Sequence, residues 1–402
     1  MLISLFGIHK SGKIIHLAIM NSSMSIRILK RLLTVTLFLA IIQISYAQQK
    51  ASRIQFVLDS LCKAGNFPGL NLAIISTDNS SIALSSGFND KEKNILLKPG
   101  HRMLHGSVGK TYVAAVALQL VEAGKISLDE KVSDYLGHYD WYTRVPNAND
   151  ITIRMLMNHT SGIMRYEFKD KFTTDLTRMP DKVWKPEELI QYVLDEPAPF
   201  EAGKGWDYSD TNYIVLGMII EQVTGKKYYD LMTANLKKLG LKNTFASDSR
   251  KMKKLAQGYA GQENAFGKQE KVLASDGKFV VNPQFEWTGG GVYGTAEDLA
   301  LWGKYLYEGK VFSVDVFKQM IDGVPAKLGK DAKYGLGVII RPSAFGITYG
   351  HSGFFPGYLT EMVYFPDYGV CVVLQTNSSD LKNLKLRPYR CLMEIARIAL
   401  QK

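Results

Sequence analysis

A serine and a lysine three residues apart open the segment with the clearest chemical potential. Ser107 and Lys110 begin an almost wholly apolar stretch, predicted to be a helix ending at Gly124, and this spacing puts both side chains on one helix face. A serine hydroxyl is a poor nucleophile at neutral pH, and a lysine whose pKa is lowered by burial is one way to activate it. The helix N-terminus would also favour negative charge developing near Ser107. Ser-x-x-Lys alone is a weak signal, but a lysine on a buried helix needs a reason to be there.

A series of further short motifs follows this pair. The motifs are Ser107-Val108-Gly109-Lys110, Gly124-Lys125-Ile126-Ser127-Leu128-Asp129, Asn158-His159-Thr160-Ser161-Gly162, Tyr208-Ser209-Asp210-Thr211-Asn212-Tyr213, Gly289-Gly290-Gly291 with Thr295-Ala296-Glu297-Asp298-Leu299, and Gly350-His351-Ser352-Gly353. In type and order they resemble the class C β-lactamases together with the serine DD-peptidases and carboxylesterases that share their fold. The resemblance extends over nearly all of residues 51–400, and the ordered set is highly specific.

The resemblance implies a role for each matching residue. Ser107 resembles the acylated serine and Lys110 its hydrogen-bonded partner. Tyr208 resembles the residue whose phenol or phenolate relays a proton to the leaving group and later serves the attacking water. The triplet His351-Ser352-Gly353 matches the third motif, on a strand along the pocket edge. The backbone N–H groups of Ser107 and Phe354 would form the oxyanion hole, worth several kcal/mol to a tetrahedral intermediate.

Two positions depart from the family pattern. His351 stands where β-lactamases of this class have lysine, and a mostly neutral imidazole holds a substrate carboxylate less well, which argues against a dedicated β-lactamase. Asp210 stands where Tyr-x-Asn has an amide donor, whereas a carboxylate only accepts hydrogen bonds. If Asp210 faces Lys110, it favours the ammonium form and shifts the expected general base toward Tyr208. Reading Ser209-Asp210-Thr211 as the class A Ser-Asp-Asn motif fails at Thr211.

The elements that must position these residues fall into two groups. Strand-like runs at 70–76 and 82–86, separated by Asp78-Asn79-Ser80, predict a hairpin, and further strands are predicted at 335–340, 347–349, 358–365 and 370–375. Helices are predicted at 54–62, 213–223 and 389–400. Together these features predict an α/β fold, β-lactamase/transpeptidase-like, in which terminal helices flank a central antiparallel sheet. A mostly helical lobe at approximately 106–280 is inserted into a sheet lobe at approximately 48–105 and 281–402, with a cleft between them.

The first 47 residues have the pattern of a secretory signal. They contain five Lys and Arg, no Asp or Glu, an apolar run over 32–44 and the ending Ser45-Tyr46-Ala47. A retained membrane anchor is the alternative, since the flanks could extend the run toward about 20 residues. The start of translation, at Met1, Met20 or Met24, stays open. Cleavage predicts a periplasmic or extracellular domain over 48–402 and, by removing five positive charges, lowers the formal charge from +11 to +6.

Composition and the context of the motifs limit which partners and cofactors the protein is expected to bind. No stretch of Lys and Arg interleaved with aromatic residues supports nucleic acid binding. The run Gly289–Gly291 lacks the strand-to-helix context of a phosphate loop, and Cys62, Cys371 and Cys391 lack metal-ligand spacing. We therefore expect neither a metal nor an organic cofactor. A disulfide between Cys62 and Cys391 stays open, because both lie in predicted terminal helices.

The sequence thus predicts an exported serine hydrolase that acts through a serine acyl-enzyme on an amide or ester. D-alanyl-D-alanine carboxypeptidase-like and carboxylesterase-like activities rank nearly equal, with weak or no β-lactamase activity. The substrate would be a small molecule or short peptide, with cell-wall peptide among the candidates, and membrane contact is expected only if the signal segment is retained. The alternative, motivated by Asp210, is a sensor that binds penicillin or wall peptide without turnover.

Overall fold

The computed structural model describes residues 48–267 and 269–401. The chain divides into two compact units, Met1–Ile54 and Gln55–Lys402. Of the first unit only 48–54 are described, and they are helical; the predicted signal segment lies outside the described residues. None of the helices formed by the described residues is long and apolar enough to cross a membrane.

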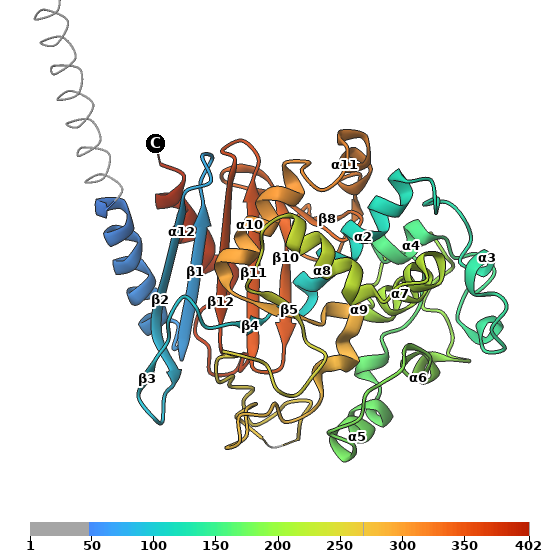
Figure 1. The fold of residues 1–402 in the computed structure, drawn as a ribbon, viewed down its shortest axis with the longest axis horizontal. Helices are drawn as coiled ribbons and strands as arrows, with labels where there is room; N and C mark the ends of the chain where they lie inside the picture. The colour runs from blue at the N-terminus through green and yellow to red at the C-terminus, as the bar shows by residue number, and fades with distance from the viewer. Residues whose placement is uncertain (1–47, 268, 402) are drawn as a thin grey trace, which may run out of the picture. The chain divides into compact units, whose positions relative to one another are not determined.

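A nine-stranded antiparallel sheet forms the centre of the second unit (Figure 1). Its strand order is β3-β2-β1-β12-β11-β10-β9-β8-β7, so strands from both ends of the chain pair at β1 and β12. The strands are β1 Gly69–Ile75, β2 Ser81–Asp90, β3 Ile95–Leu96, β7 Val324–Pro325, β8 Lys333–Tyr334, β9 Ile339–Ser343, β10 Gly346–Phe355, β11 Tyr358–Phe365 and β12 Val370–Thr376. This arrangement confirms the predicted central sheet.

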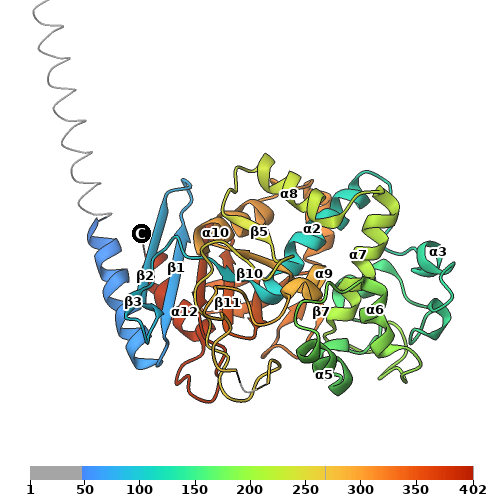
Figure 2. The ribbon, with the colours of Figure 1, turned by 60° about the horizontal axis from the view of Figure 1, so that its bottom comes forward.

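Helices cover both faces of this sheet. In β11, Met362 packs against Gly303 of α10 (Ala296–Tyr307), whereas the preceding residue, Glu361, faces the opposite way. Helix α12 (Pro388–Ala399) packs on β11 and β12 from that opposite face. Figure 2 shows the two helices on either side of the strands. Double coverage explains why β1 and β12 are buried at every position and lack polar alternation.

The helical region lies between β4 and β6. It contains α2 Lys110–Glu122, α3 Ser133–Leu136, α4 Ile153–Asn158, α5 Asp170–Arg178, α6 Pro186–Ile190, α7 Asp210–Thr224 and α8 Tyr228–Lys238, and short 3-10 turns. Strands β4 Met103–Leu104, β5 Thr244–Ala246 and β6 Val292–Gly294 form a second, three-stranded sheet, α9 is Trp287–Gly290, and α11 is Val314–Met320. Helices α2 and α7 are buried on nearly every side, which accounts for their apolar sequences.

Two details differ from the sequence-based expectations. Of the strand predicted at 335–340 only the last two residues are in a strand, the start of β9; residues 335–338 form an irregular link between β8 and β9, because Gly337 adopts a φ of +78° that a continuous strand does not allow. The helix predicted from residue 213 begins at Asp210 and ends before Gly225, whose φ is +65°. Cys62, Cys371 and Cys391 are all buried free thiols in the structure.

Candidate active site

Ser107 lies in a tight 3-10 turn, η1 (Gly106–Gly109), which leads into α2 and packs against the end of β10. Gly106 has a φ of +53°, and a Cβ atom there would lie only 2.8 Å from the Phe354 nitrogen. A Cβ on Gly353 would lie 1.9 Å from the His105 carbonyl oxygen. Glycine at both positions therefore permits the nucleophile turn to touch the strand.

The neighbouring part of β10 has a free edge. Strand β9 pairs with β10 only at 346–350, so among the described residues 351–355 have no strand partner on that side. Unpaired strand edges present backbone N–H and C=O groups. The backbone of Phe354 thus lies where a second oxyanion donor would be needed, while its side chain is 53% exposed.

Lys110 connects the nucleophile to the helical lobe. The side chain is fully buried, and its Nζ donates to Ser107 Oγ at 3.3 Å, to Asp210 Oδ1 and to the Gly289 carbonyl. These contacts use all three ammonium donors. Burial opposes the charge, but the Asp210 carboxylate outweighs burial and raises the pKa of Lys110 above its ordinary value. In the resting site Lys110 is therefore an ammonium that donates to Ser107.

Tyr208 lies against the same ammonium. Lys110 Nζ is 4.9 Å from the centre of the Tyr208 ring, and the ring of His159 lies 4.2 Å away, centroid to centroid. Among the described residues the buried Tyr208 hydroxyl has no hydrogen-bond partner. Burial raises the pKa of Tyr208 to about 12, although Lys110 and Ser107 act to lower it. Tyr208 is consequently a neutral phenol at pH 7, with its hydroxyl free for a proton transfer.

Asp210 is held between two cations. Its Oδ1 accepts from Lys110, and its Oδ2 accepts from Arg165 Nη2 at 3.0 Å. Burial disfavours the carboxylate, but the charges of Lys110 and Arg165 together hold the pKa of Asp210 well below its usual range. Both carboxylate oxygens are occupied, so Asp210 neither donates to a substrate carbonyl nor turns toward one.

Three ionisable residues of the site, Arg165, Glu167 and Glu286, were not singled out by the sequence analysis. Arg165 Nε donates to Glu167 Oε1 at 2.6 Å, and burial followed by the charge of Asp210 raises the pKa of Glu167 well above its ordinary value. Glu286 lies beside Gly289, and burial together with Asp210 raises its pKa to about 8. The available signal for Arg165 was its position three residues after the Asn158–Gly162 motif.

His351 belongs to the aromatic wall around Tyr208. It is 2% exposed, its Nδ1–H donates to the Ser352 carbonyl at 2.7 Å, and its Nε2 accepts from the Tyr334 hydroxyl at 2.8 Å. Burial lowers the pKa of His351 to about 3. The imidazole is therefore neutral, and both nitrogens already have partners.

The Ser352 side chain points to the opposite face of the sheet. Its hydroxyl donates to Glu361 Oε2 at 2.7 Å and accepts from the Arg341 guanidinium at 3.2 Å. Consecutive strand residues face opposite ways, and the register pairs His351 with Met362 and Ser352 with Glu361. The structure therefore brings Ser107, Lys110, Tyr208, Asp210 and His351 together with the backbone of Gly353 and Phe354, and leaves the Ser352 hydroxyl outside.

A cavity of about 560 Å³ opens beside Trp206. The ring of Trp206, which lines it, lies 6.5 Å from the ring of Tyr208. The remaining lining residues are Phe200, Gly205, Pro325, Ala326, Lys327, Gly329, Asp331 and Ala332. The space is large enough for a small-molecule group.

A serine bonded to a buried lysine at a helix start, facing a buried tyrosine beside the free edge of an antiparallel sheet, defines a serine hydrolase of the β-lactamase type. Comparison with known proteins agrees with this class. The Beta-lactamase family model matches residues 54–390, and the chain belongs to that family. This confirms the resemblance inferred from the motifs.

Several relatives are similar over much of their length. The penicillin-binding protein PbpX of Bacillus subtilis is 28% identical over 70% of this chain and 63% of its own length, so this chain spans less than two thirds of that relative. Another penicillin-binding protein of the same organism is 24% identical over 83% of this chain and 73% of its own. The D-amino acid amidase of Ochrobactrum anthropi, solved with L-phenylalanine amide, superposes with a TM-score of 0.74 at 24% identity, covering 88% of this chain and 100% of the amidase, which shows the shared fold.

Proposed function

We propose that this protein is an exported hydrolase that cleaves an amide or ester bond of a small molecule or short peptide through an ester on Ser107. The hydrogen bond from Lys110 Nζ to Ser107 Oγ carries the proposal, because it fixes the hydroxyl beside a positive charge and next to Tyr208. D-alanyl-D-alanine-type peptides and short-chain esters are the two substrate groups. The names of the relatives, penicillin-binding protein and D-amino acid amidase, support an acyl substrate of the first kind.

Acylation follows from the protonation states. Ser107 Oγ attacks the substrate carbonyl carbon, and the backbone N–H groups of Ser107 and Phe354 would stabilise the oxyanion. The Lys110 ammonium stabilises the charge that develops on Oγ. Because the phenol of Tyr208 is neutral, it accepts the Ser107 proton while passing its own proton to the leaving nitrogen or oxygen. Water then attacks the ester carbonyl carbon and gives a proton to Tyr208, while Tyr208 passes its own proton to Ser107 Oγ, which leaves as the ester C–O bond breaks.

Export is the less direct part of the proposal. It is supported by the charge and apolar pattern of residues 1–47, which lie outside the described residues. Expression of the full chain in a Gram-negative host, followed by fractionation and N-terminal sequencing, would test it. We expect a periplasmic product beginning near Gln48; a cytoplasmic product that keeps residues 1–47 would contradict export.

The nucleophile can be tested with a fluorophosphonate label and a p-nitrophenyl ester. We expect the parent to be labelled at Ser107 and to hydrolyse the ester. Ser107→Ala should lose labelling and at least about 10³-fold in kcat/KM. Ser60→Ala is the control, because Ser60 is exposed and its hydroxyl bonds only the Phe56 carbonyl. Equal hydrolysis by parent and Ser107→Ala would refute the assignment.

A sensor that is acylated without turnover is the second candidate. It is favoured by Lys110, whose three donors are engaged, and by Tyr208, whose pKa of about 12 leaves little phenolate to activate the deacylating water. A time course with fluorescent penicillin separates the candidates. Label that persists without product supports the sensor, and repeated turnover excludes it.

A further inference from the structure

The site offers few cations that could bind an anionic substrate. Lys110 has no donor left, because its ammonium already contacts Ser107, Asp210 and Gly289. His351 is neutral and uses both ring nitrogens. The third motif therefore supplies no positive charge to a substrate carboxylate.

Arg341 is also unsuitable as a ligand for such a group. Its guanidinium donates to the Ser352 hydroxyl at 3.2 Å and lies 4.8 Å from the centre of the Tyr389 ring, on the α12 face of the sheet. His351 and the nucleophile turn lie on the other side of β10. Lys327 lines the cavity, but the cation that contacts Asp210 and the Tyr208 ring lies on the opposite wall of the site, in the helical lobe.

Arg165 occupies that wall with unused donors. Its side chain is 28% exposed, and Nε and Nη2 donate to Glu167 and Asp210. Nη1 makes no hydrogen bond within the part of the chain that the structure describes. The guanidinium carbon lies 4.0 Å from the centre of the Phe168 ring and 5.3 Å from that of Tyr208. The ion pair with Asp210, the hydrogen bond to Glu167 and two aromatic rings thus fix the guanidinium, and both N–H groups of Nη1 are left available.

We propose that Arg165 is a substrate-binding residue that donates from Nη1 to a carboxylate of the substrate, and so makes the enzyme select anionic acyl compounds. Arginine suits this role because its planar fork stays charged and binds carboxylates directionally. The inference rests on the proposed function and names its substrate class. In this proposal the helical lobe supplies the positive charge that the third motif, His351-Ser352-Gly353, lacks.

The charge of the surrounding cluster favours such a substrate. Lys110 and Arg165 are positive and Asp210 is negative, and burial together with Asp210 raises the pKa values of Glu167 and Glu286, which disfavours further negative charge. The positive charges of Lys110 and Arg165 therefore outweigh the negative charge of Asp210. A carboxylate would complement this charge, and a substrate ammonium would be repelled by it.

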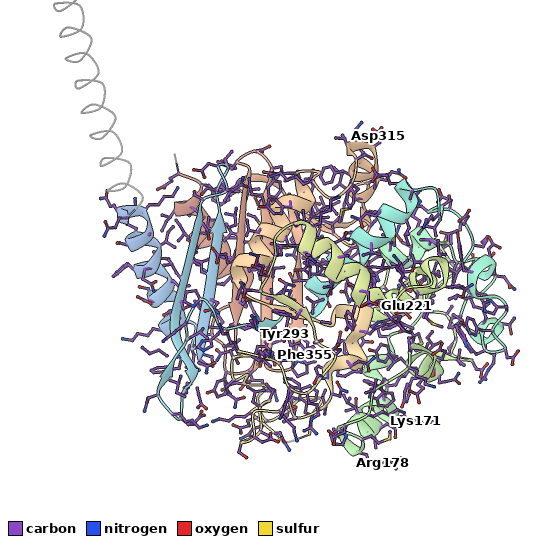
Figure 3. All side chains as sticks on the ribbon, in the orientation of Figure 1. Lys171, Arg178, Glu221, Tyr293, Asp315 and Phe355 are labelled. Atoms are coloured by element: carbon purple, nitrogen blue, oxygen red, sulfur yellow. The ribbon has the colours of Figure 1, made fainter. Side chains whose placement is uncertain are left out.

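The test uses two matched pairs of substrates. N-succinyl and N-acetyl D-alanine p-nitrophenyl esters differ in a carboxylate on the acyl side. An acetylated D-alanyl-D-alanine peptide with a free or an amidated C-terminus differs in a carboxylate on the leaving side. For the parent, Arg165→Gln, Arg165→Lys and the control Arg178→Gln, kcat and KM are measured for all four. Arg178 is 75% exposed and lies at the end of α5 (Figure 3).

We expect the parent to prefer the carboxylate member of at least one pair. In Arg165→Gln that preference should fall by about 10- to 100-fold, the range of one hydrogen bond to a charged group. The loss should appear mainly in KM, and Arg165→Lys should restore part of it. Arg178→Gln should match the parent.

The opposite outcomes are equally clear. No carboxylate preference in the parent, or a preference that persists in Arg165→Gln, would overturn the role of Arg165. Fluorophosphonate labelling of Ser107 is followed in parallel in every variant. A parent that labels but does not discriminate refutes this inference alone, whereas a parent that does not label at Ser107 refutes the proposed function.

Discussion

Two lysines of this protein are fully buried, and they differ in the groups that accept hydrogen bonds from their ammonium groups. Lys304 of α10 donates to Glu308 Oε1 at 2.5 Å, one turn along the same helix, and to the Gly369 carbonyl at 2.7 Å in the turn between β11 and β12. Lys110 likewise contacts one carboxylate and one backbone carbonyl, those of Asp210 and Gly289, but its third contact is the Ser107 hydroxyl. Both lysines hold elements together, and only Lys110 also touches a potential nucleophile.

The carboxylate partners show how the two environments differ in solvent access. The Glu308 side chain is 22% exposed and also pairs with Lys310, whereas Asp210 is 6% exposed and lies between Lys110 and Arg165. Solvent can replace part of the Lys304 interaction but little of the Lys110 interaction. A buried ion pair by itself is therefore no sign of a catalytic site. What distinguishes the candidate site is that the Lys110 ammonium also donates to the Ser107 hydroxyl.

Replacing each lysine by methionine should give the largest contrast. Lys110→Met should lower kcat/KM for a p-nitrophenyl ester by about 10³-fold or more, because Ser107 loses its charged partner. Lys304→Met should leave kcat/KM unchanged. Circular dichroism of both variants verifies folding. Similar activity losses in the two folded variants would break the distinction.

Removing each carboxylate should separate the two pairs in stability. Asp210→Ala leaves Lys110 and Arg165 without their shared partner and should cost about 3–5 kcal/mol in the free energy of unfolding. Glu308→Ala should cost about 1–3 kcal/mol, because water can reach the vacated position. Urea denaturation of both variants measures the difference. Equal costs would show that solvent access does not distinguish the pairs.

The pH profile tests whether Asp210 keeps Lys110 charged. Asp210 raises the pKa of Lys110, so the parent ammonium should keep its proton throughout pH 7–10. In Asp210→Asn the pKa of Lys110 should fall, and kcat/KM should gain an ascending step in that range, because the neutral amine accepts the Ser107 proton. The parent should also show a step near pH 8 from Glu286, and this step should move to lower pH in Asp210→Asn, because the Asp210 charge helps to raise the pKa of Glu286.

Glu308→Gln is the matched control for that experiment, because it neutralises the partner of the other lysine. Its pH profile should coincide with that of the parent. Parallel profiles for the parent and Asp210→Asn would show that Asp210 does not set the protonation of Lys110 in the working enzyme.

The smallest effect is expected from a half-buried hydroxyl on the far face of the sheet. Ser352→Ala removes a hydroxyl that bonds Glu361 and Arg341, so kcat/KM should stay close to that of the parent. Unfolding should become easier by about 1 kcal/mol, the worth of a typical hydrogen bond. An activity loss like that of Lys110→Met would mean that Ser352 acts on substrate after all.

The sequence by itself determined the elements and the local chemistry of this protein. Ser107 and Lys110 share a helix start because their spacing is local, and the apolar runs around β11 and β12 needed no distant information to be recognised as strands. Asp210 was recognisable as a departure from the family pattern. These predictions depend on neighbours along the chain, where propensity and periodicity act.

Only the tertiary structure decided which partners those residues have. The pairing of Asp210 with Lys110 and Arg165, and the place of Glu286 beside them, depend on how α2, α7 and two loops pack. Because consecutive residues of a strand point to opposite faces, His351 faces Tyr334 while Ser352 faces Glu361. A shift of one residue in the register of β10 would exchange the faces of these two side chains. Charge states followed from burial and from contacts far apart in the chain, which no local pattern encodes.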